Sequence, residues 1–442
     1  MWAVATLGTS DFPDQRLATR AVAMLGQLAA RPGDSIPHGA PSAAAAKGDY
    51  RFLENDRVKP QHIWNPLHEH TAKSLKGIDQ IVVIQDTTTL MFPHLKCTTG
   101  LGTVQRPTEE GLLMHSALAV TPKGHLVGLL HNEVWARPLS EFGKGKDCEK
   151  RPIEDKESFE WIRGMHRVTE LTDCFSPQTA LVHIFDRGGD VHEVLGELLD
   201  LKQDGIIRSA RDRRVEGEYG YIRRTLAAAP VLGQTTVDVP RKKGQHTRTA
   251  KLQLRSATVT LSPPRCYAHR EALTINAVWV HEPSAPEAAE PLDWLLFTTL
   301  RVQTAKQCLK VVTLYKLRWR IEDFHLTLKS GCRIEKTQLK TAQRIEVLLA
   351  MLCAVAVRIE QLTYWARTDP DAPCTVVLSQ DEWKVLWAYS HKRPLPTGHG
   401  PPTIAQAVSM IGRLGGHLGR KCDAMPGVRS LWKGWRDLQI LV

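Results

Sequence analysis

The sequence lacks the features that mark a secreted, disulfide-rich or membrane-spanning protein. Its nine cysteines include no C-x-x-C pair, which argues for reduced thiols in a cytoplasm and against a disulfide framework or a zinc finger. The longest apolar run, VLLAMLCAVAV at 347–357, is too short to cross a bilayer and predicts a core helix. The N-terminus has no basic stretch followed by an apolar one, so we expect no export and no membrane partner.

Several catalytic motifs are missing as well. The chain has no G-x4-G-K-[ST] sequence for nucleotide binding, no H-E-x-x-H for a zinc protease and no G-x-S-x-G for a serine hydrolase. Its 26 prolines and 31 glycines are spread along the chain, so no long linker or disordered class is indicated. These absences leave a globular protein of another kind.

Positive charge is in excess. The net charge is +11 and the isoelectric point is near 9.2. Clustered Lys and Arg gain affinity for a phosphate backbone by releasing counterions, so this excess favours a polyanionic partner. Many basic proteins have no such partner, and charge alone does not decide the question. At 442 residues the chain is long enough for two or three domains.

The order of elements predicts an α/β fold with a ribonuclease-H-like (retroviral-integrase-like) core. Helical patterns at 14–31 and 42–55 precede a buried strand that we expect to end at Asp86. A hairpin, a helix and a second buried strand follow, and that strand ends at Asp186. An Asp after a strand is often only a turn or cap residue. In open α/β sheets, however, functional groups gather beyond the carboxyl ends of strands.

The rest of the pattern suggests three regions. Period-two alternation between Asp186 and Glu322 predicts a β-rich insertion at about 212–300, and the pattern is helical again after Gly331. We therefore expect a helical N-terminal domain at 1–60, a catalytic domain at 61–365 and a helical C-terminal domain at 366–442.

The stretch YKLRWRIEDFHLTLKSG at 315–331 predicts one amphipathic helix. Its apolar stripe and its polar line lie on opposite sides, the first made of Leu317, Ile321, Phe324 and Leu328 and the second of Tyr315, Arg318, Glu322 and Lys329. One carboxylate flanked by a phenol and two cations suits phosphate chemistry, whereas a glycosidase with paired carboxylates would not explain the cations. Two Asp at strand exits and a Glu on a helix are the ligand types of a two-metal phosphoryl-transfer site.

The spacing Tyr-x2-Arg-x3-Glu-x6-Lys resembles the signature of the bacterial DDE cut-and-paste transposases of the insertion-sequence-four family. That family's first Asp stands in a D-T-T context, as Asp86 does here, and its second stands in D-R-x-x-D-x-H, as Asp186 does. The blocks GLLHNEVWARP, IIRSARDR and PLDWLLFT also have counterparts. The resemblance covers nearly the whole chain.

The resemblance implies that two Mg²⁺ ions, or Mn²⁺ in their place, bind Asp86, Asp186 and Glu322. It implies that DNA phosphates near the scissile bond are held by Tyr315, Arg318, Lys329 and Arg208. In the N-terminal domain it implies end recognition by Arg20 and Arg51, with Tyr50 beside them. Trp294 would stack on a flipped base. It also begins an apolar run, so the alternative is that it is a core residue. The run Arg241, Lys242 and Lys243 is either a phosphate-contacting loop or a solvated face.

The implied function is cut-and-paste transposition on double-stranded DNA, by nicking, hairpin formation and strand transfer into target DNA. The implied partners are the inverted repeats, the target and a second copy in the synaptic complex, in the bacterial nucleoid. The chain stops soon after LWKGWRDLQ, where the family continues into a helical tail that pairs subunits. A transposase-derived DNA-binding regulator without strand transfer therefore stays as the alternative. Gly188 and Gly189 stand where the family has larger residues, which predicts a looser turn after Asp186.

Overall fold

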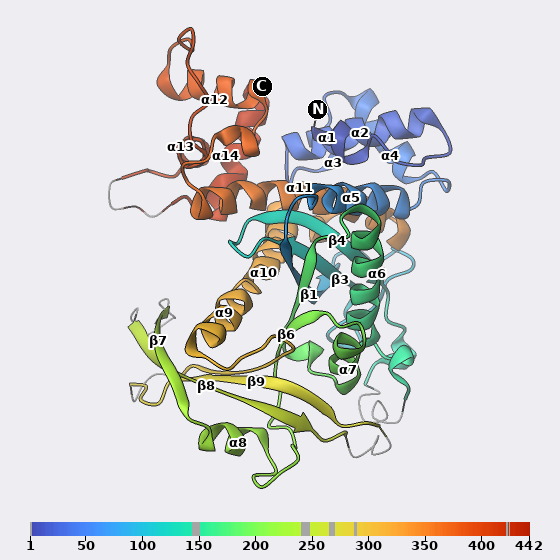
Figure 1. Cartoon of the computed structure of the whole chain (residues 1–442). Helices are drawn as coiled ribbons and strands as arrows, with labels where there is room; N and C mark the ends of the chain where they lie inside the picture. Colours follow the sequence, from blue (N-terminus) through green and yellow to red (C-terminus); the bar gives the residue numbers. More distant parts are fainter. Residues whose placement is uncertain are drawn as a thin grey trace.

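The computed structural model describes residues 2–143, 151–239, 248–264, 270–286, 290–420, 423 and 425–442 (Figure 1). One mixed sheet runs through the middle of this described part of the chain. Its ten strands are β1 (Gln80–Met91), β2 (Gly102–Thr103), β3 (Glu110–Val120), β4 (Leu126–Trp135), β5 (Ala180–Phe185), β6 (Asp204–Arg208), β7 (Val231–Val239), β8 (Arg248–Leu261), β9 (Leu273–His281) and β10 (Asp293–Thr298).

In the first half of the sheet the strand order is β4-β3-β1-β5-β6, which fits the ribonuclease-H-like fold expected from the sequence. Strands β1, β3 and β4 pair antiparallel, and β5 and β6 continue parallel to β1. The parallel strands are apolar because both of their faces are covered, as the fully buried run 81–84 shows. The mixed α/β core predicted from the sequence is thus confirmed.

The second half of the sheet is the β-rich insertion. Strand β10 pairs antiparallel with β6, and β9, β8 and β7 follow it outward as a meander. Figure 1 shows this meander at the end of the molecule away from both chain termini. The insertion therefore extends the catalytic sheet and does not form a separate sheet.

Helices surround the core and fill both terminal regions (Figure 1). They are α1 (Trp2–Leu7), α2 (Gln15–Ala30), α3 (Ile36–Gly39), α4 (Ala43–Leu53), α5 (Gln61–Ser74), α6 (Phe159–Phe175), α7 (His192–Asp200), α8 (Ile222–Ala228), α9 (Ala305–Lys316), α10 (Trp319–Leu326), α11 (Ala342–Thr368), α12 (Gln380–His391), α13 (Ile404–Leu414) and α14 (Val428–Leu441). A π-helical turn spans Thr327–Gly331, and short 3₁₀ turns span Leu139–Glu141, Ile153–Asp155, Arg187–Gly189, Ile334–Lys336 and Cys374–Val376.

Helix α11 is the central helix of the molecule. It contains the apolar run 347–357 and packs against α2, α5, α13, α14 and β4. A helix that is apolar on all sides is stable only when neighbours cover all sides. Within the described ranges, none of the helices has the length and apolar character needed to cross a membrane.

Three sequence expectations were wrong in detail. Strand β1 does not end at Asp86, because antiparallel pairing with β3 continues as far as Met91 opposite Gly111. The single helix expected at 315–331 is divided between α9, α10 and the π-helical turn. Tyr315 and Arg318, expected on a polar face, are also only 3% and 7% exposed, and Tyr315 packs edge-on against Trp294 of the insertion.

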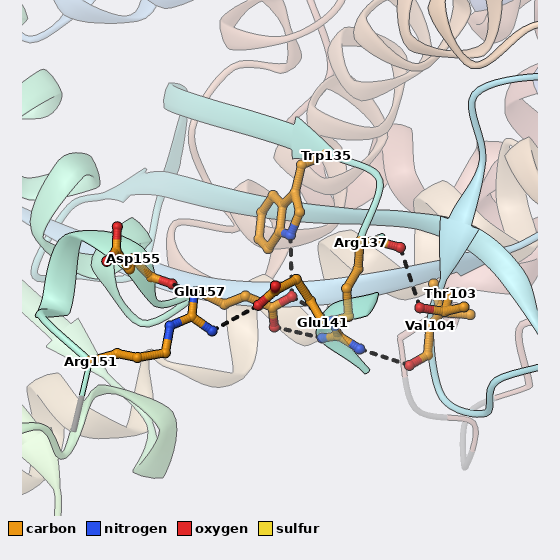
Figure 2. Close-up of polar contacts among 8 residues, drawn as sticks. All are labelled: Thr103, Val104, Trp135, Arg137, Glu141, Arg151, Asp155 and Glu157. Carbon is orange, nitrogen blue, oxygen red and sulfur yellow. Dashed lines mark hydrogen bonds and ion pairs between the residues drawn. The ribbon is translucent and has the colours of Figure 1, made fainter. Parts of the chain in front are cut away.

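A polar junction fixes the start of α6 to the sheet (Figure 2). Arg137, after β4, donates two 2.5 Å hydrogen bonds to Glu157, just before α6. The same Arg137 donates to the carbonyl of Val104 at 2.9 Å, and its own carbonyl accepts from the backbone N–H of Thr103 in β2 at 2.8 Å. Such forked pairs are geometrically specific. The junction thereby holds together β2, β4 and the helix that covers one face of the site strands.

Candidate active site

The pairing of β1 with β5 brings Asp86 near Asp186. Residues of β1 pair with β5 at a constant offset as far as Ile84 opposite Ile184. Asp86 follows two residues later within β1, whereas Asp186 comes directly after Phe185, the last residue of β5, and is the N-cap of a 3₁₀ turn. The negative charge of Asp186 contributes to the raised pKa of Asp86, so the two carboxylates lie within electrostatic reach of each other.

Electrostatics couple a third carboxylate to this pair. Burial and the negative charges of Asp186 and Glu322 together raise the pKa of Asp86 to about 7, against the opposing effects of the Thr87 backbone N–H and Arg318. Asp186 is oriented by its own turn, because its carboxylate accepts a 2.7 Å hydrogen bond from the backbone N–H of Gly188. The three acidic residues predicted from the sequence therefore face one region.

Glu322 is held by a cation on its own helix. Arg318 Nη2 lies 2.6 Å from Glu322 Oε1, and the Arg318 guanidinium stacks on the ring of Trp319 at 4.7 Å. The Arg318 side chain is only 9% exposed, whereas that of Glu322 is 43% exposed. The carboxylate of Glu322 is thus accessible from solvent and paired at the same time.

The donor set fits a hard divalent cation. Asp86, Asp186 and Glu322 offer oxygen ligands only, which Mg²⁺ prefers. Their mutual repulsion, which adds to the effect of burial in raising the pKa of Asp86, is what a bound cation would relieve. Among the residues that the structure describes, no three His, Cys, Asp or Glu side chains already surround one point closely enough to hold a metal ion. Glu322 in this structure is engaged by Arg318.

The predicted phosphate ligands border the same region. Burial raises the pKa of Tyr315, while the nearby cations Arg318 and Arg208 oppose that rise. Burial lowers the pKa of Lys329, against the opposing charges of Glu335 and Asp86. Trp294 is half-buried and meets the ring of Tyr315 edge-on, with ring centroids 6.1 Å apart. The fold thus gathers side chains from β6, β10, α9 and the π-helical turn.

A buried ion pair between Arg213 and Asp190 anchors the loop that follows Arg208. Nothing in the sequence indicated the role of Arg213. Arg213 donates to Asp190 Oδ1 at 2.7 Å, and both side chains are almost fully buried. Asp190 Oδ2 also accepts from the backbone N–H of Ala210 at 2.7 Å. Asp190 belongs to the D-R-x-x-D motif, so the motif contained the only signal for this anchor of the loop after β6.

The turn after Asp186 is tight, contrary to the looser turn expected. A Cβ on Gly189 would stand 2.6 Å from the Cβ of Phe185, and one on Gly188 would stand 3.1 Å from Trp161. No larger side chain fits there without movement. The glycines therefore let the loop pack directly on the sheet.

The remaining predicted DNA contacts lie outside this group. Arg20 on α2 pairs with Asp49 at 3.5 Å, and Tyr50 and Arg51 are exposed on α4. The run from Arg241 to Lys243 falls outside the described residues.

Comparison with known families identifies similar sequences along most of the chain. Residues 1–58 match the family described as transposase DNA-binding, residues 167–358 the transposase DDE domain, and residues 354–442 the transposase Tn5 dimerisation domain. The DDE match includes Asp186, Tyr315 and Glu322, and it begins after Asp86.

One solved structure with a remote likeness is that of the piggyBac transposase synaptic complex with hairpin DNA, determined by cryo-electron microscopy. The identity is 11% and the TM-score 0.37, over 80% of this chain and 66% of that one, just under two thirds of its length. At that TM-score the likeness carries no argument about this chain.

Proposed function

Because the chain belongs to the DDE transposases and has a dimerisation region of the Tn5 type, we propose that it catalyses cut-and-paste transposition of an insertion sequence. The steps are nicking at the transposon end, hairpin formation there, and strand transfer into target DNA. The observation that carries the proposal is that Asp86 lies within electrostatic reach of both Asp186 and Glu322.

DDE transposases use divalent metal ions, and we assign the site here to two Mg²⁺ ions, with Mn²⁺ able to substitute. Asp86, Asp186 and Glu322 would hold them. When bound, such a pair stabilises the entering and leaving oxygens of an in-line displacement. Asp186 is already oriented by Gly188, whereas Glu322 must exchange its contact with Arg318.

Phosphate binding falls to the basic and phenolic groups around the carboxylates. Arg318 is fixed by the ring of Trp319 and is largely buried, so it offers a positioned fork of N–H donors. Lys329, Tyr315 and Arg208 approach the same region from other elements. Phosphoryl transfer depends on positioning and charge neutralisation, which this arrangement supplies. We assign Trp294, at the edge of Tyr315, to stacking on a base extruded at the hairpin.

The terminal regions supply the partners in this proposal. Arg20, Tyr50 and Arg51 would read the inverted repeats from a domain at 1–60, joined to a catalytic domain at 61–365. Residues 366–442 would pair two copies on the two ends, in the nucleoid of a bacterial cytoplasm. The match of 354–442 to a dimerisation family supports that pairing.

The test uses linear duplex DNA carrying the inverted repeats that flank the gene, with Mg²⁺. Wild-type protein should bind the ends in a gel-shift assay and nick them. Glu322→Gln and Asp186→Ala should bind with unchanged affinity and leave the DNA intact. Wild-type protein that binds the ends without cutting them would instead support the regulator. Equal cleavage by the variants would remove these carboxylates from the mechanism.

A further inference from the structure

A chain of hydrogen-bonded side chains crosses the sheet on the face turned away from the aspartates. It begins at Thr87, passes through three fully buried side chains and ends at the backbone of α6. The contacts are Thr87 Oγ1 to His115 Nδ1 at 2.8 Å, His115 Nε2 to Gln85 Oε1 at 2.9 Å, Gln85 Nε2 to His183 Nδ1 at 3.4 Å, His183 Nε2 to Gln203 Oε1 at 2.9 Å, Gln203 Nε2 to Thr169 Oγ1 at 2.6 Å and Thr169 Oγ1 to the Met165 carbonyl at 2.8 Å.

The far end of this chain fixes the direction of every bond. Thr169 donates its only hydroxyl proton to the carbonyl of Met165, so it must accept from the amide nitrogen of Gln203. Burial lowers the pKa of His115 to about 3 and that of His183 to about 4, so both rings are neutral. With neutral rings each earlier group has one role, and both His115 and His183 carry their proton on Nε2. Every side-chain nitrogen and oxygen atom named in the chain has a hydrogen-bond partner.

At the other end of this hydrogen-bonded series, Gln85 and Thr87 are the residues directly before and after Asp86. Gln85 and Thr87 point to one face of β1, because they are two residues apart, and Asp86 between them points to the other. The core packing agrees, since Val82 and Ile84 pack with the α11 side of the sheet and Val83 with the α6 side. A single ring, His115, bonds both Gln85 and Thr87 from the neighbouring strand, where it stands opposite Thr87. Two bonds on either side of one residue fix the rotation of the strand there.

Helix α6 closes over this arrangement. Trp161 meets His115 edge-on, with centroids 4.9 Å apart, and Phe185 in the same manner at 5.2 Å. Its ring also lies where a side chain on Gly188 would be, in the turn that orients Asp186. Gly164 comes so close that an added Cβ would stand 2.4 Å from Gln85 Oε1. Helix α6 thus contacts both the strand that carries Asp86 and the turn that follows Asp186.

We propose that His115 is a positioning residue for the metal-binding carboxylates, holding Gln85 and Thr87 so that Asp86 keeps its orientation toward Asp186. This inference rests on the proposed function. His115 touches no reacting group and acts only through its two neighbours. Partners that orient metal ligands typically matter by about 10- to 100-fold in metal affinity or activity, and small misplacements of reacting groups can cost about 100-fold.

The first experiment removes the two hydrogen bonds of the His115 ring separately. His115→Asn keeps an acceptor near Nδ1 for Thr87, whereas His115→Gln keeps a donor near Nε2 for Gln85. We expect each variant to bind the ends as wild type does, to nick about 10- to 100-fold more slowly, and to need more Mg²⁺ for half-maximal rate. His115→Leu, which keeps neither bond, should be the slowest. Wild-type nicking and Mg²⁺ dependence in all three variants would overturn the proposal.

The second experiment disturbs Gln85 from helix α6 and compares two glycine-to-alanine variants. Gly164→Ala forces the Gln85 amide to move, whereas Gly196→Ala on α7 makes only an ordinary contact, 3.9 Å from a methyl group of Leu273. Both exchanges add one methyl group to a helix. Only Gly164→Ala should slow nicking while end binding is kept. Equal nicking rates for the two variants would show that the hydrogen bonds of His115 to Gln85 and Thr87 have no role in nicking.

A readout independent of cleavage is the imidazole proton signal of the DNA-free protein. The structure requires Nε2–H protons on His115 and His183 that exchange slowly with water. Thr169→Val should disturb the His183 signal, whereas Thr172→Val should not, because the Thr172 hydroxyl bonds only the Val168 carbonyl of α6. Absence of both protected signals in wild type would overturn the proposal. If the wild-type protein shows the protected imidazole signals but never nicks DNA, the proposed function is wrong, whereas the buried hydrogen-bonded series is confirmed.

Discussion

Single side chains near the site differ in whether they face the reacting region or hold its loops. Asp190 is of the second kind, although it shares a motif with Asp186. It is completely buried and neutralises Arg213, while Ser209 and Ala210 donate to its other oxygen. A buried pair of this type is costly to break from one side, because the remaining charge has no water to solvate it.

Asp190→Ala should therefore lower the free energy of unfolding by about 3–5 kcal/mol, measured by urea denaturation. Nicking should fall with it, since Arg208 lies on the strand that leads into the released loop. The matched control is Glu69→Ala, which breaks the exposed Lys73 pair at 2.9 Å. That loss should be at most about 0.5 kcal/mol. Equal losses in the two variants would refute the buried-pair argument.

Residue type, spacing and the family resemblance were enough to predict the three carboxylates and the phosphate ligands, because those features are local in the sequence, and their roles stay predictions. Arg213 and His115 could not be named this way. Their roles depend on partners 23 and 30 residues away, which only strand pairing brings together. The orientation of Glu322 toward Arg318 was also open, since helical spacing permits the pair without requiring it.

At the scale of elements, the sequence predicted the order of strands and helices but not the bend between 315 and 331. The apolar stripe is continuous, so periodicity alone gives one helix. The π-helical turn coincides with a contact to a residue outside this stretch, in which the Thr327 hydroxyl donates to the buried carboxyl of Glu360 on α11. The backbone N–H of Cys332 then bonds the Thr327 carbonyl at 2.8 Å, closing a five-residue turn. This turn sets where Lys329 points.

Glu360 should make stability depend on pH. Burial raises its pKa to about 7, with Thr327 opposing and Asp323 adding to the rise. A raised folded-state pKa means that the folded protein retains a proton that the unfolded chain has lost. Stability should therefore be highest below about pH 4.5 for this group and be lost as the pH rises through 7.

Glu360→Gln, which keeps a similar shape, should reduce that dependence by one proton in unfolding curves taken between pH 5 and 8. Glu69→Gln, at an exposed position, is the control and should leave the slope unchanged. Parallel curves for wild type and Glu360→Gln would show that the carboxyl is not protonated when folded.

At the scale of the whole molecule, the terminal regions pack on the central helix and on each other. Arg358 of α11 lies between the rings of Trp2 and Trp435, at 4.8 and 5.1 Å, and pairs with Glu382 at 3.0 Å. Trp435 also donates to the carbonyl of Ala29 at 2.9 Å. Residues from both ends of the chain thereby meet at Arg358, and Trp435 is tied to the end of α2.

The crossing of α13 and α14 depends on glycine. A Cβ on Gly434 would stand 1.7 Å from the carbonyl oxygen of Ile411, so Gly434→Ala must separate the two helices. We expect this variant to bind single ends normally and to lose the paired-end complex on native gels. Gly427→Ala, at the start of α14 with open space around it, should keep pairing. Normal pairing by Gly434→Ala would exclude this helix pair from dimerisation.

Gly331, two residues beyond Lys329, is where three distant segments touch. Its carbonyl oxygen would lie 2.4 Å from a Cβ on Gly33, which has a φ of +81°, and the ring of Trp432 would lie 2.7 Å from a Cβ on Gly331 itself. A chimaera that exchanges the first sixty or so residues for those of a relative keeps this joint only if the donor supplies a glycine at the same place. If the first sixty residues read the terminal sequence as proposed, an exchange of this region must keep the close approach of Gly33 to Gly331.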